Sequence, residues 1–166
     1  MHLVIDGYNL IRRSPELTRA EARGQGREAL TAALKLYRQA KKHRVTVVLD
    51  GGANPLGERG SLNGVPLVYS GVDRTADDVI AALAAEHGDG VTVITDDQEL
   101  AGRCEAHGAP VVGSGEFGDI LLMAAWGMEG PLESDDEGWD FTTRKKGPSK
   151  REPKAKRKTS KRIKQL

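Results

Sequence analysis

The stretch LVIDGYNLI, residues 3–11, stands almost at the start of the chain and guides the interpretation of the rest of the sequence. Its apolar residues run directly into Asp6, and glycine, tyrosine and asparagine come next. Such a continuous apolar run is typical of a parallel strand that helices cover on both faces. Asp6 has no obvious helix to cap, because Gly7 comes directly after it and the next clear helix is remote. The stretch therefore predicts a buried strand that ends in a polar site at the edge of a sheet.

Further along the chain, short apolar runs alternate with segments of helical period. We expect strands over residues 2–6, 45–50, 66–70, 91–95 and 109–112. We expect helices over residues 26–43, 75–88, 96–108 and 116–127. Strands separated by helices predict the α/β class, here a three-layer sandwich with a mainly parallel central sheet and helices on both faces.

The charge of the 166-residue chain is divided unevenly, although its formal net charge is only +1. Residues 144–166 contain twelve Lys and Arg and one acid, whereas residues 1–143 contain thirteen basic and 23 acidic residues. We expect a folded domain over 1–129, an acidic linker over 130–143 and a disordered basic tail over 144–166, because the last two have few apolar residues. The tail predicts a polyanionic partner, and a solvated end that only aids solubility is the alternative.

Several protein classes are excluded by what the sequence lacks. The single cysteine, Cys104, rules out an internal disulfide framework and fits a reducing compartment. No apolar run approaches membrane-spanning length and no signal-peptide pattern precedes the first strand, so we expect a cytoplasmic protein with no membrane partner. The His and Cys residues lack the spacing of a zinc site, and the glycine-rich nucleotide-binding motifs are missing.

Acidic side chains come after four of the expected strands. They are Asp6, Asp50, the pair Asp77 and Asp78, and the pair Asp96 and Asp97. Because the carboxyl ends of parallel strands meet at one edge of a sheet, we expect these acids to converge. Crowded carboxylates repel one another unless a cation neutralises them. The hard divalent cations Mg²⁺ and Mn²⁺ prefer such oxygen ligands, so the pattern predicts a metal site.

Helix capping is a structural alternative for one acid of each pair. Thr75 and Asp78 have the T-x-x-D spacing of a capping box. Asp96 can likewise be the N-cap of the next helix, with Glu99 three residues later. Acids in a first helical turn are also favoured by the helix dipole without any ligand. The members left for chemistry are Asp77 and Asp97.

Other polar residues near these acids have two interpretations each. Asp50 begins the triplet D-G-G, which suits a turn as well as a metal ligand. Asn9 either orients Asp6 or binds a phosphate oxygen, and as a turn residue it needs no function. The flanking arginines either contact a substrate backbone or pair with the acids. These arginines are Arg12, Arg13 and Arg74.

The segments LVIDGYNLI, VTVVLDGG, TADDVI and VITDDQEL, with GAPVVGSGEF after them, together resemble the YacP-like branch of NYN domains, within the PIN-like nucleases. The resemblance runs in order across roughly residues 3–117. It implies a compact α/β sheet, an acidic divalent-metal site and endonucleolytic cleavage of RNA. It also implies RNA turnover as the cellular role, with the ribosome as a partner in some members.

The resemblance also implies roles for single residues. Asp6 matches the family's first-strand aspartate, and Asn9 matches the asparagine of its signature. Asp77 matches the acid after T-A, and Asp97 matches the last acid of a T-x-D pattern that Thr95 begins. Relatives often have a small residue where Asp96 stands. This departure leaves two roles for Asp96, a metal ligand or a helix cap.

The leading hypothesis is a metal-dependent endoribonuclease. Three acids would hold one or two Mg²⁺ or Mn²⁺ ions and two more would support them, while Thr75, Asp78 and Thr95 cap or brace the site. The three are Asp6, Asp77 and Asp97, and the two are Asp50 and Asp96. One alternative is a non-catalytic RNA- or ribosome-binding protein of the same fold. A phosphatase of the haloacid dehalogenase type ranks last, because Tyr8 stands where a second acid is needed. No oligomeric state can be deduced from the sequence.

Overall fold

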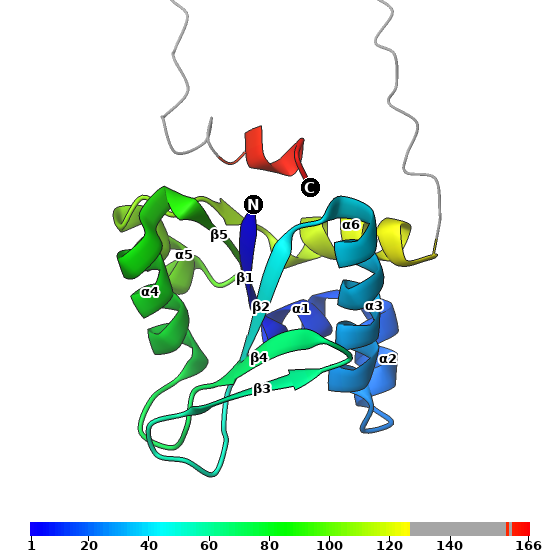
Figure 1. The fold of residues 1–166 in the computed structure, drawn as a ribbon, viewed down its shortest axis with the longest axis horizontal. Helices are drawn as coiled ribbons and strands as arrows, with labels where there is room; N and C mark the ends of the chain where they lie inside the picture. Colours follow the sequence, from blue (N-terminus) through cyan, green and yellow to red (C-terminus); the bar gives the residue numbers. More distant parts are fainter. Residues whose placement is uncertain (127–158, 160) are drawn as a thin grey trace, which may run out of the picture.

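The computed structural model of the chain describes residues 1–126, 159 and 161–166, which contain one six-stranded mixed sheet (Figure 1). The strands are β1 (His2–Asp6), β2 (Arg44–Leu49), β3 (Glu58–Leu62), β4 (Val65–Tyr69), β5 (Val91–Ile94) and β6 (Val111–Val112). Their spatial order is β3-β4-β2-β1-β5-β6, and all neighbours are parallel except the hairpin of β3 and β4. The sheet is therefore mainly parallel, as the sequence predicts.

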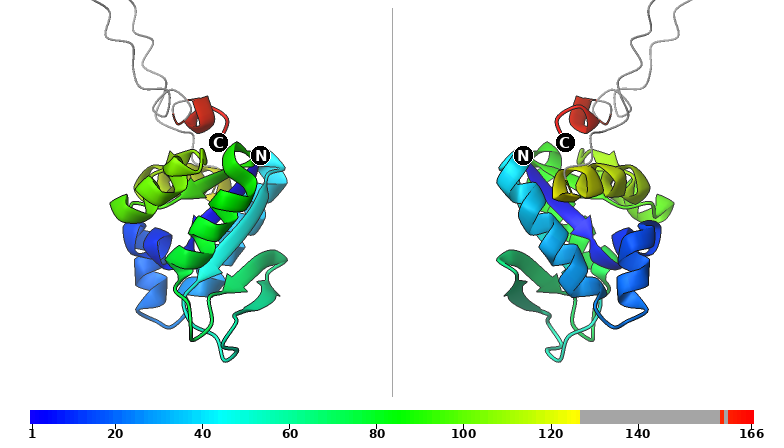
Figure 2. Two further views of the ribbon diagram at one scale, coloured as in Figure 1. Left: turned by 90° about the vertical axis from the view of Figure 1, so that its left-hand side faces the viewer. Right: turned by 90° about the vertical axis from the view of Figure 1, so that its right-hand side faces the viewer.

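Helices cover both faces of this sheet. They are α1 (Gly7–Arg13), α2 (Pro15–Glu21), α3 (Gly26–Lys41), α4 (Ala76–His87), α5 (Gln98–Ala106) and α6 (Ser114–Trp126), with a 3₁₀ turn, η1 (Gly88–Gly90). The two side views show α4 and α5 on one face and α1, α2, α3 and α6 on the other (Figure 2). The predicted three-layer α/β architecture is confirmed. None of the described helices is long and apolar enough to cross a membrane.

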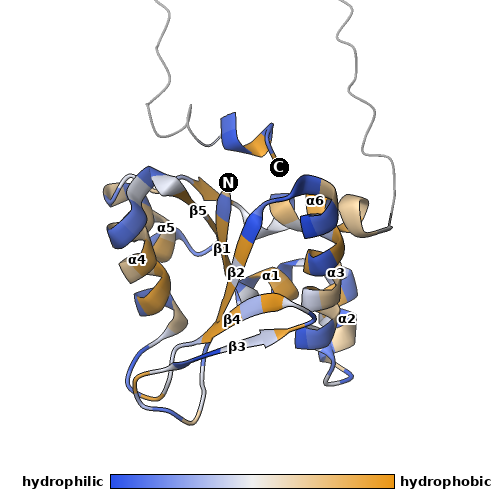
Figure 3. Cartoon of the chain, viewed as in Figure 1, coloured by the Kyte–Doolittle hydropathy of each residue, from blue (hydrophilic) through white to orange (hydrophobic). Residues whose placement is uncertain are grey.

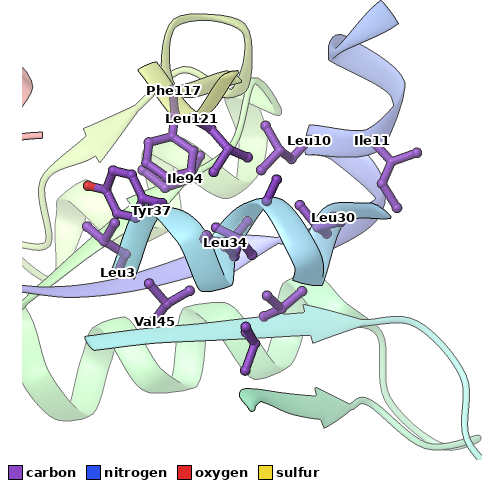
Figure 4. Close-up of a cluster of buried hydrophobic side chains, with 14 of the residues drawn as sticks. Leu3, Leu10, Ile11, Leu30, Leu34, Tyr37, Val45, Ile94, Phe117 and Leu121 are labelled. Carbon is purple, nitrogen blue, oxygen red and sulfur yellow. The ribbon is translucent and has the colours of Figure 1, made fainter. Parts of the chain in front are cut away.

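The central strand β1 is buried on both faces, as its apolar sequence predicts. Leu3 and Ile5 belong to the hydrophobic cluster beneath α3 and α6, whereas Val4 belongs to the cluster beneath α4 and α5. All three side chains are fully buried. In the first cluster, the ring of Tyr37 packs edge-on against Phe117 at a centroid distance of 5.3 Å (Figure 4). Burial of this kind is the main stabilising contribution to the fold.

Three elements are not expected from the sequence, namely β3, α1 and α2. Strand β3 has the sequence ERGSL and is mostly exposed, so it lacks the apolar signal of the other strands. The helices α1 and α2 have only seven residues each, too few for a clear helical period. Helix α1 begins at Gly7, where an added Cβ would lie 2.5 Å from Leu49 Cδ2 and 3.1 Å from the Val48 carbonyl oxygen. The glycine after Asp6 therefore allows close packing of α1 on β2.

The predicted linker over 130–143 and most of the basic tail lie outside the described residues. The final residues, 161–166, are described and lie against the domain, beside the chain's amino terminus (Figure 1). Leu166 is buried in the same cluster as Leu3, and Ile163 packs against that cluster. Arg162 Nη2 donates a hydrogen bond of 2.8 Å to the carbonyl oxygen of Asp89. The end of the tail thus packs on the amino-terminal end of the sheet.

Candidate active site

Asp6 is the last residue of β1, and its carboxylate is almost completely buried. It is also the N-cap of α1, because its Oδ1 accepts a hydrogen bond of 3.1 Å from the backbone N–H of Asn9. The expectation that Asp6 has no helix to cap is therefore wrong. Burial raises the pKa of Asp6 to about 6, and the negative charges of Asp77 and Asp50 add to the rise. The hydrogen bonds from Asn9 and Thr95 lower the pKa and so act in the opposite direction.

The hydroxyl of Thr95 links the end of β1 to the loop after β5. It donates to Asp6 Oδ2 over 3.4 Å and accepts a hydrogen bond of 3.1 Å from the backbone N–H of Asp97. Thr95 is itself buried. One side chain therefore fixes the relative positions of two acids that are ninety-one positions apart in the chain.

Asp97 is the N-cap of α5, the role that the sequence predicts for Asp96. Its Oδ1 accepts hydrogen bonds of 2.9 Å and 3.0 Å from the backbone N–H groups of Glu99 and Leu100. Its side chain is exposed at the edge of the sheet. The cap lies one residue later than expected because α5 begins only at Gln98, while β5 ends at Ile94.

Asp96 faces a different helix, α6. Its two carboxylate oxygens accept hydrogen bonds of 3.1 Å and 3.3 Å from the backbone N–H groups of Ser114 and Gly115. Arg13 Nε lies 3.1 Å from Asp96 Oδ2 and forms an ion pair with it. The backbone N–H of Asp96 donates over 3.1 Å to Asn9 Oδ1. Asp96 therefore joins α1, α6 and the loop after β5.

The second pair of acids lies in the first turn of α4. Thr75 is the N-cap, and its Oγ1 accepts a hydrogen bond of 3.2 Å from the backbone N–H of Asp78. The exposed carboxylate of Asp78 lies 2.9 Å from Arg103 Nη2, and this hydrogen bond lowers the pKa of Asp78. The surroundings of Asp77 are different. Burial makes the largest contribution to its raised pKa, the negative charges of Asp97 and Asp50 add to the rise, and the positive charge of Arg103 opposes it.

Asp50 comes directly after β2 and reaches the start of α4. Its Oδ1 accepts a hydrogen bond of 2.6 Å from the backbone N–H of Ala76. This contact holds the first turn of α4, and hence Asp77, against the carboxyl end of β2. Asp50 is exposed. The D-G-G triplet forms a turn, as one of its two interpretations predicts, and Gly51 has a φ of 97° and Gly52 one of 110°. The structure therefore gives Asp50 a bracing contact as well as a place near the other acids.

The flanking arginines have different surroundings. Arg13 pairs with Asp96, and Arg74 Nη2 donates a hydrogen bond of 3.2 Å to the carbonyl oxygen of Leu56. Arg12 is exposed and forms no ion pair with any of the described residues. Of these three arginines, Arg12 is thus the one whose side chain makes no ion pair or hydrogen bond with the described residues.

Four carboxylates converge at the carboxyl end of the sheet, and we call this set the acidic edge. Its members are Asp6, Asp50, Asp77 and Asp97. The negative charges of Asp77 and Asp50 raise the pKa of Asp6, and those of Asp97 and Asp50 raise the pKa of Asp77. These carboxylates therefore lie near enough to repel one another. In the described residues, no group of three or more His, Cys, Asp or Glu side chains is arranged to hold a metal ion as the side chains stand.

The role of the GSG turn before α6 is not foreseen from the sequence. Gly113 allows the approach of Asp96, because an added Cβ would lie 2.8 Å from Asp96 Oδ1. Ser114 is fully buried, and its Oγ has no hydrogen-bond partner among the described residues. The only available signal is the pair of glycines flanking a serine at the start of a helical segment, a pattern that suits close approach of an anion.

The mainly parallel sheet, with acids at the carboxyl ends of its strands, agrees with the PIN-like architecture that the sequence motifs resemble. The chain matches the family model of the YacP-like NYN domain over residues 3–165, and it belongs to that family. NYN domains are PIN-like domains of nuclease type, so the family gives this chain a function related to RNA. No curated protein sequence matches the chain significantly.

Solved structures that share the fold include two of Rae1 (YacP). A crystal structure of Rae1 (YacP) from Bacillus subtilis is 25% identical with a TM-score of 0.61, and the match covers 75% of each chain. A crystal structure of a mutant of the same protein, with one tryptophan replaced by leucine, is 23% identical with a TM-score of 0.62. That match covers 75% of this chain and 76% of the mutant chain. These likenesses extend the family assignment to the three-dimensional fold.

Proposed function

We propose that the protein is a divalent-metal-dependent endoribonuclease that hydrolyses RNA phosphodiester bonds at the acidic edge. The observation that carries this proposal is the convergence of four carboxylates from the connections after four strands, two of them with raised pKa values. In keeping with the family resemblance, we also propose that it acts in the cytoplasm, in RNA turnover and in contact with the ribosome.

The donor set of the acidic edge suits Mg²⁺ or Mn²⁺. All four groups offer carboxylate oxygens, and these ions keep several waters, so a few carboxylates are enough. Asp50 and Asp97 each use one oxygen, Oδ1, for the backbone N–H groups described above. NYN and PIN-like nucleases generally use divalent metals. A bound ion would supply an activated water and would stabilise the charge that develops on the phosphate.

Each residue of the site has a proposed role. Asp6, Asp77 and Asp97 hold the metal, and Asp50 supports them while it braces α4. Thr95 keeps Asp6 and Asp97 in register through its two hydrogen bonds. We assign Asp96 to positioning rather than to metal binding, because both of its oxygens already accept backbone N–H groups.

The remaining polar residues act on the substrate or on the framework. Asn9 fixes the loop after β5, since its Oδ1 accepts the backbone N–H of Asp96. We propose that exposed Arg12 contacts a phosphate of the RNA backbone, as does Arg74, which comes immediately before the N-cap of α4. Thr75 caps α4 and so sets the direction of Asp77.

A non-catalytic RNA- or ribosome-binding protein is the second candidate. One observation favours it. Among the described residues, no three Asp, Glu, His or Cys side chains are arranged so that they could bind a metal ion together. On this hypothesis the acids serve as caps and braces, which is a role that the structure gives to three of them.

Incubation of the purified protein with single-stranded and structured RNA separates the two candidates. We expect internal cleavage with Mn²⁺ and none with EDTA, because the carboxylates alone provide no activated water. RNA binding without cleavage in either condition would favour the non-catalytic candidate. Cleavage that persists unchanged in EDTA would contradict the proposed metal dependence.

A further inference from the structure

A basic surface lies at the end of the sheet that the acidic edge does not occupy. We call it the basic face, and its members are Lys35, Arg38, Lys42 and Arg44. Together with Asn63 and Gly64 of the β3–β4 turn they line a hollow of about 510 Å³. The residues that line this hollow include no Asp or Glu. Such a concave surface of one sign concentrates counter-ions of the opposite sign.

The basic face and the acidic edge lie at opposite ends of the parallel strands. Arg44 begins β2 and pairs in register with His2, the first residue of β1. Asp6 ends β1 four residues later, which corresponds to roughly 13 Å of extended strand. A ligand of the basic face is therefore not the group that reacts at the acidic edge, but a part of the substrate away from it.

The four cations of the basic face form no ion pair with the described residues. No carboxylate among them lies within ion-pair distance of its four side chains, and only Arg38 has a described side-chain bond, to the carbonyl oxygen of Gly64. The pKa of the neighbouring His43 is lowered by burial, and then by the positive charges of the Met1 amino group and Lys41. The charges that act on His43 at this end of the sheet are therefore positive.

Helix capping does not account for all of these cations. Arg38 and Lys42 lie at the carboxyl-terminal end of α3, where a positive charge is favoured by the helix dipole. Lys35 lies almost two turns earlier, and Arg44 belongs to β2, so neither gains from that dipole. Both are exposed. Their presence on the same hollow needs another explanation.

The described end of the basic tail brings further cations to the same end of the sheet. Lys161 and Lys164 are exposed in the segment that packs beside the amino terminus. Figure 3 shows hydrophilic colouring at the end of α3 and at the start of β2, and both hydrophilic and hydrophobic colouring over this segment. Both sets of cations therefore lie at the amino-terminal end of the sheet.

We propose that the basic face binds the phosphate backbone of RNA, as a second contact remote from the scissile bond. The choice of RNA rests on the proposed function, because the enzyme's own substrate is the polyanion that must be held. Guanidinium and ammonium groups bind phosphate without regard to sequence. The surface would thus anchor the RNA while the acidic edge acts on another part of it.

The test compares two variants of the full-length protein that lose the same charge. One combines Lys35→Gln, Lys42→Gln and Arg44→Gln, and leaves Arg38 with its structural bond. The matched control replaces three exposed arginines of α2, α3 and the turn between them. They are Arg19→Gln, Arg23→Gln and Arg27→Gln. Fluorescence anisotropy in EDTA then measures binding of a labelled single-stranded RNA over a range of salt concentrations.

Each lost phosphate contact lowers the slope of log K against log salt by about 0.7 for a single strand, so the basic-face variant should lose about 2. The control should change the slope by less than about 0.5. Equal changes in both variants, or no change in either, would overturn the proposal. Binding of labelled poly-glutamate with the same affinity and the same loss of slope would show that the surface takes an acidic polypeptide, and the RNA assignment would be wrong.

The same variants separate this proposal from the proposed function. The control variant should cleave RNA at the wild-type rate in Mn²⁺, because it retains both the acidic edge and the basic face, whereas the basic-face variant should need a higher RNA concentration to reach half of its maximal rate. If the wild-type protein cleaves no RNA, the nuclease proposal fails, and the binding measurement in EDTA still decides the role of the basic face.

Discussion

Asp77→Asn is expected to lower the rate of RNA cleavage by about 1,000-fold, equivalent to about 4 kcal/mol of transition-state stabilisation. The substitution keeps the size of the side chain but removes the negative charge that a divalent ion requires. Asp77 is the member of the acidic edge whose pKa responds to both Asp97 and Asp50, so it lies at the centre of the charge cluster. RNA binding by the rest of the surface should be retained.

Asp78→Asn is the matched control, since it removes the same charge from the adjacent position of α4. The carboxylate of Asp78 is exposed and is bonded to Arg103. We expect less than about a threefold change in cleavage rate, the size of effect usual for an exposed ion pair. Single-turnover cleavage assays in Mn²⁺ measure both variants. Equal loss of activity in the two variants would contradict the assignment of Asp77.

Asp6→Asn is expected to abolish cleavage and, in the absence of metal, to stabilise the fold by about 2 kcal/mol at neutral pH. A buried carboxylate with a pKa of about 6 disfavours its own charged form in the folded protein. Asparagine keeps an oxygen that can accept the N–H of Asn9 and cap α1. The gain arises because a neutral amide replaces a poorly solvated charge. Denaturant unfolding in EDTA measures it.

The pH dependence of stability is set by the direction of the same pKa shift. At pH values between 3.8, the ordinary pKa of an aspartate, and about 6, the folded protein binds more protons at Asp6 than the unfolded chain does. The stability contributed by protonation is therefore complete below pH 3.8 and is lost as the pH rises through about 6. The Asp6→Asn variant should not show this loss.

An exposed acid provides the control for this stability effect. Asp119→Asn, at an exposed position of α6, should leave the free energy of unfolding within about 0.5 kcal/mol of the wild type. If Asp6→Asn destabilises the protein at neutral pH by as much as the loss of a helix cap would, then burial does not disfavour the charged form of Asp6. In that case the electrostatic explanation of the site is wrong.

The acidic edge shows which parts of a site can be predicted from sequence. Apolar strands that end on acids placed Asp6 and Asp97 at one edge, because parallel topology brings the carboxyl ends of strands together. The sequence names Asp96 rather than Asp97 as the cap of α5, which is wrong because the partners of Asp96 lie eighteen and nineteen residues later, at the start of α6. Such a contact depends on tertiary packing that no local pattern encodes.

The fold, like the acidic edge, was predictable from the sequence in part. Strands buried on both faces, such as β1, have a continuous apolar signal, whereas β3 lies exposed on the edge of the sheet and has none. Helix α1 escaped prediction because it starts at a glycine that is required by close packing on β2 rather than by helix propensity. Position in the sheet, rather than local preference, decided the structure at these places.

Calorimetric titration with Mn²⁺ at neutral pH tests most directly whether the acidic edge binds a divalent cation. We expect binding by the wild-type protein and by Asp78→Asn, and affinity at least about tenfold weaker for Asp77→Asn and Asp6→Asn. Because the titration contains no RNA, its result does not depend on cleavage. Identical isotherms for all four proteins, or no binding by the wild type, would contradict the proposed metal site.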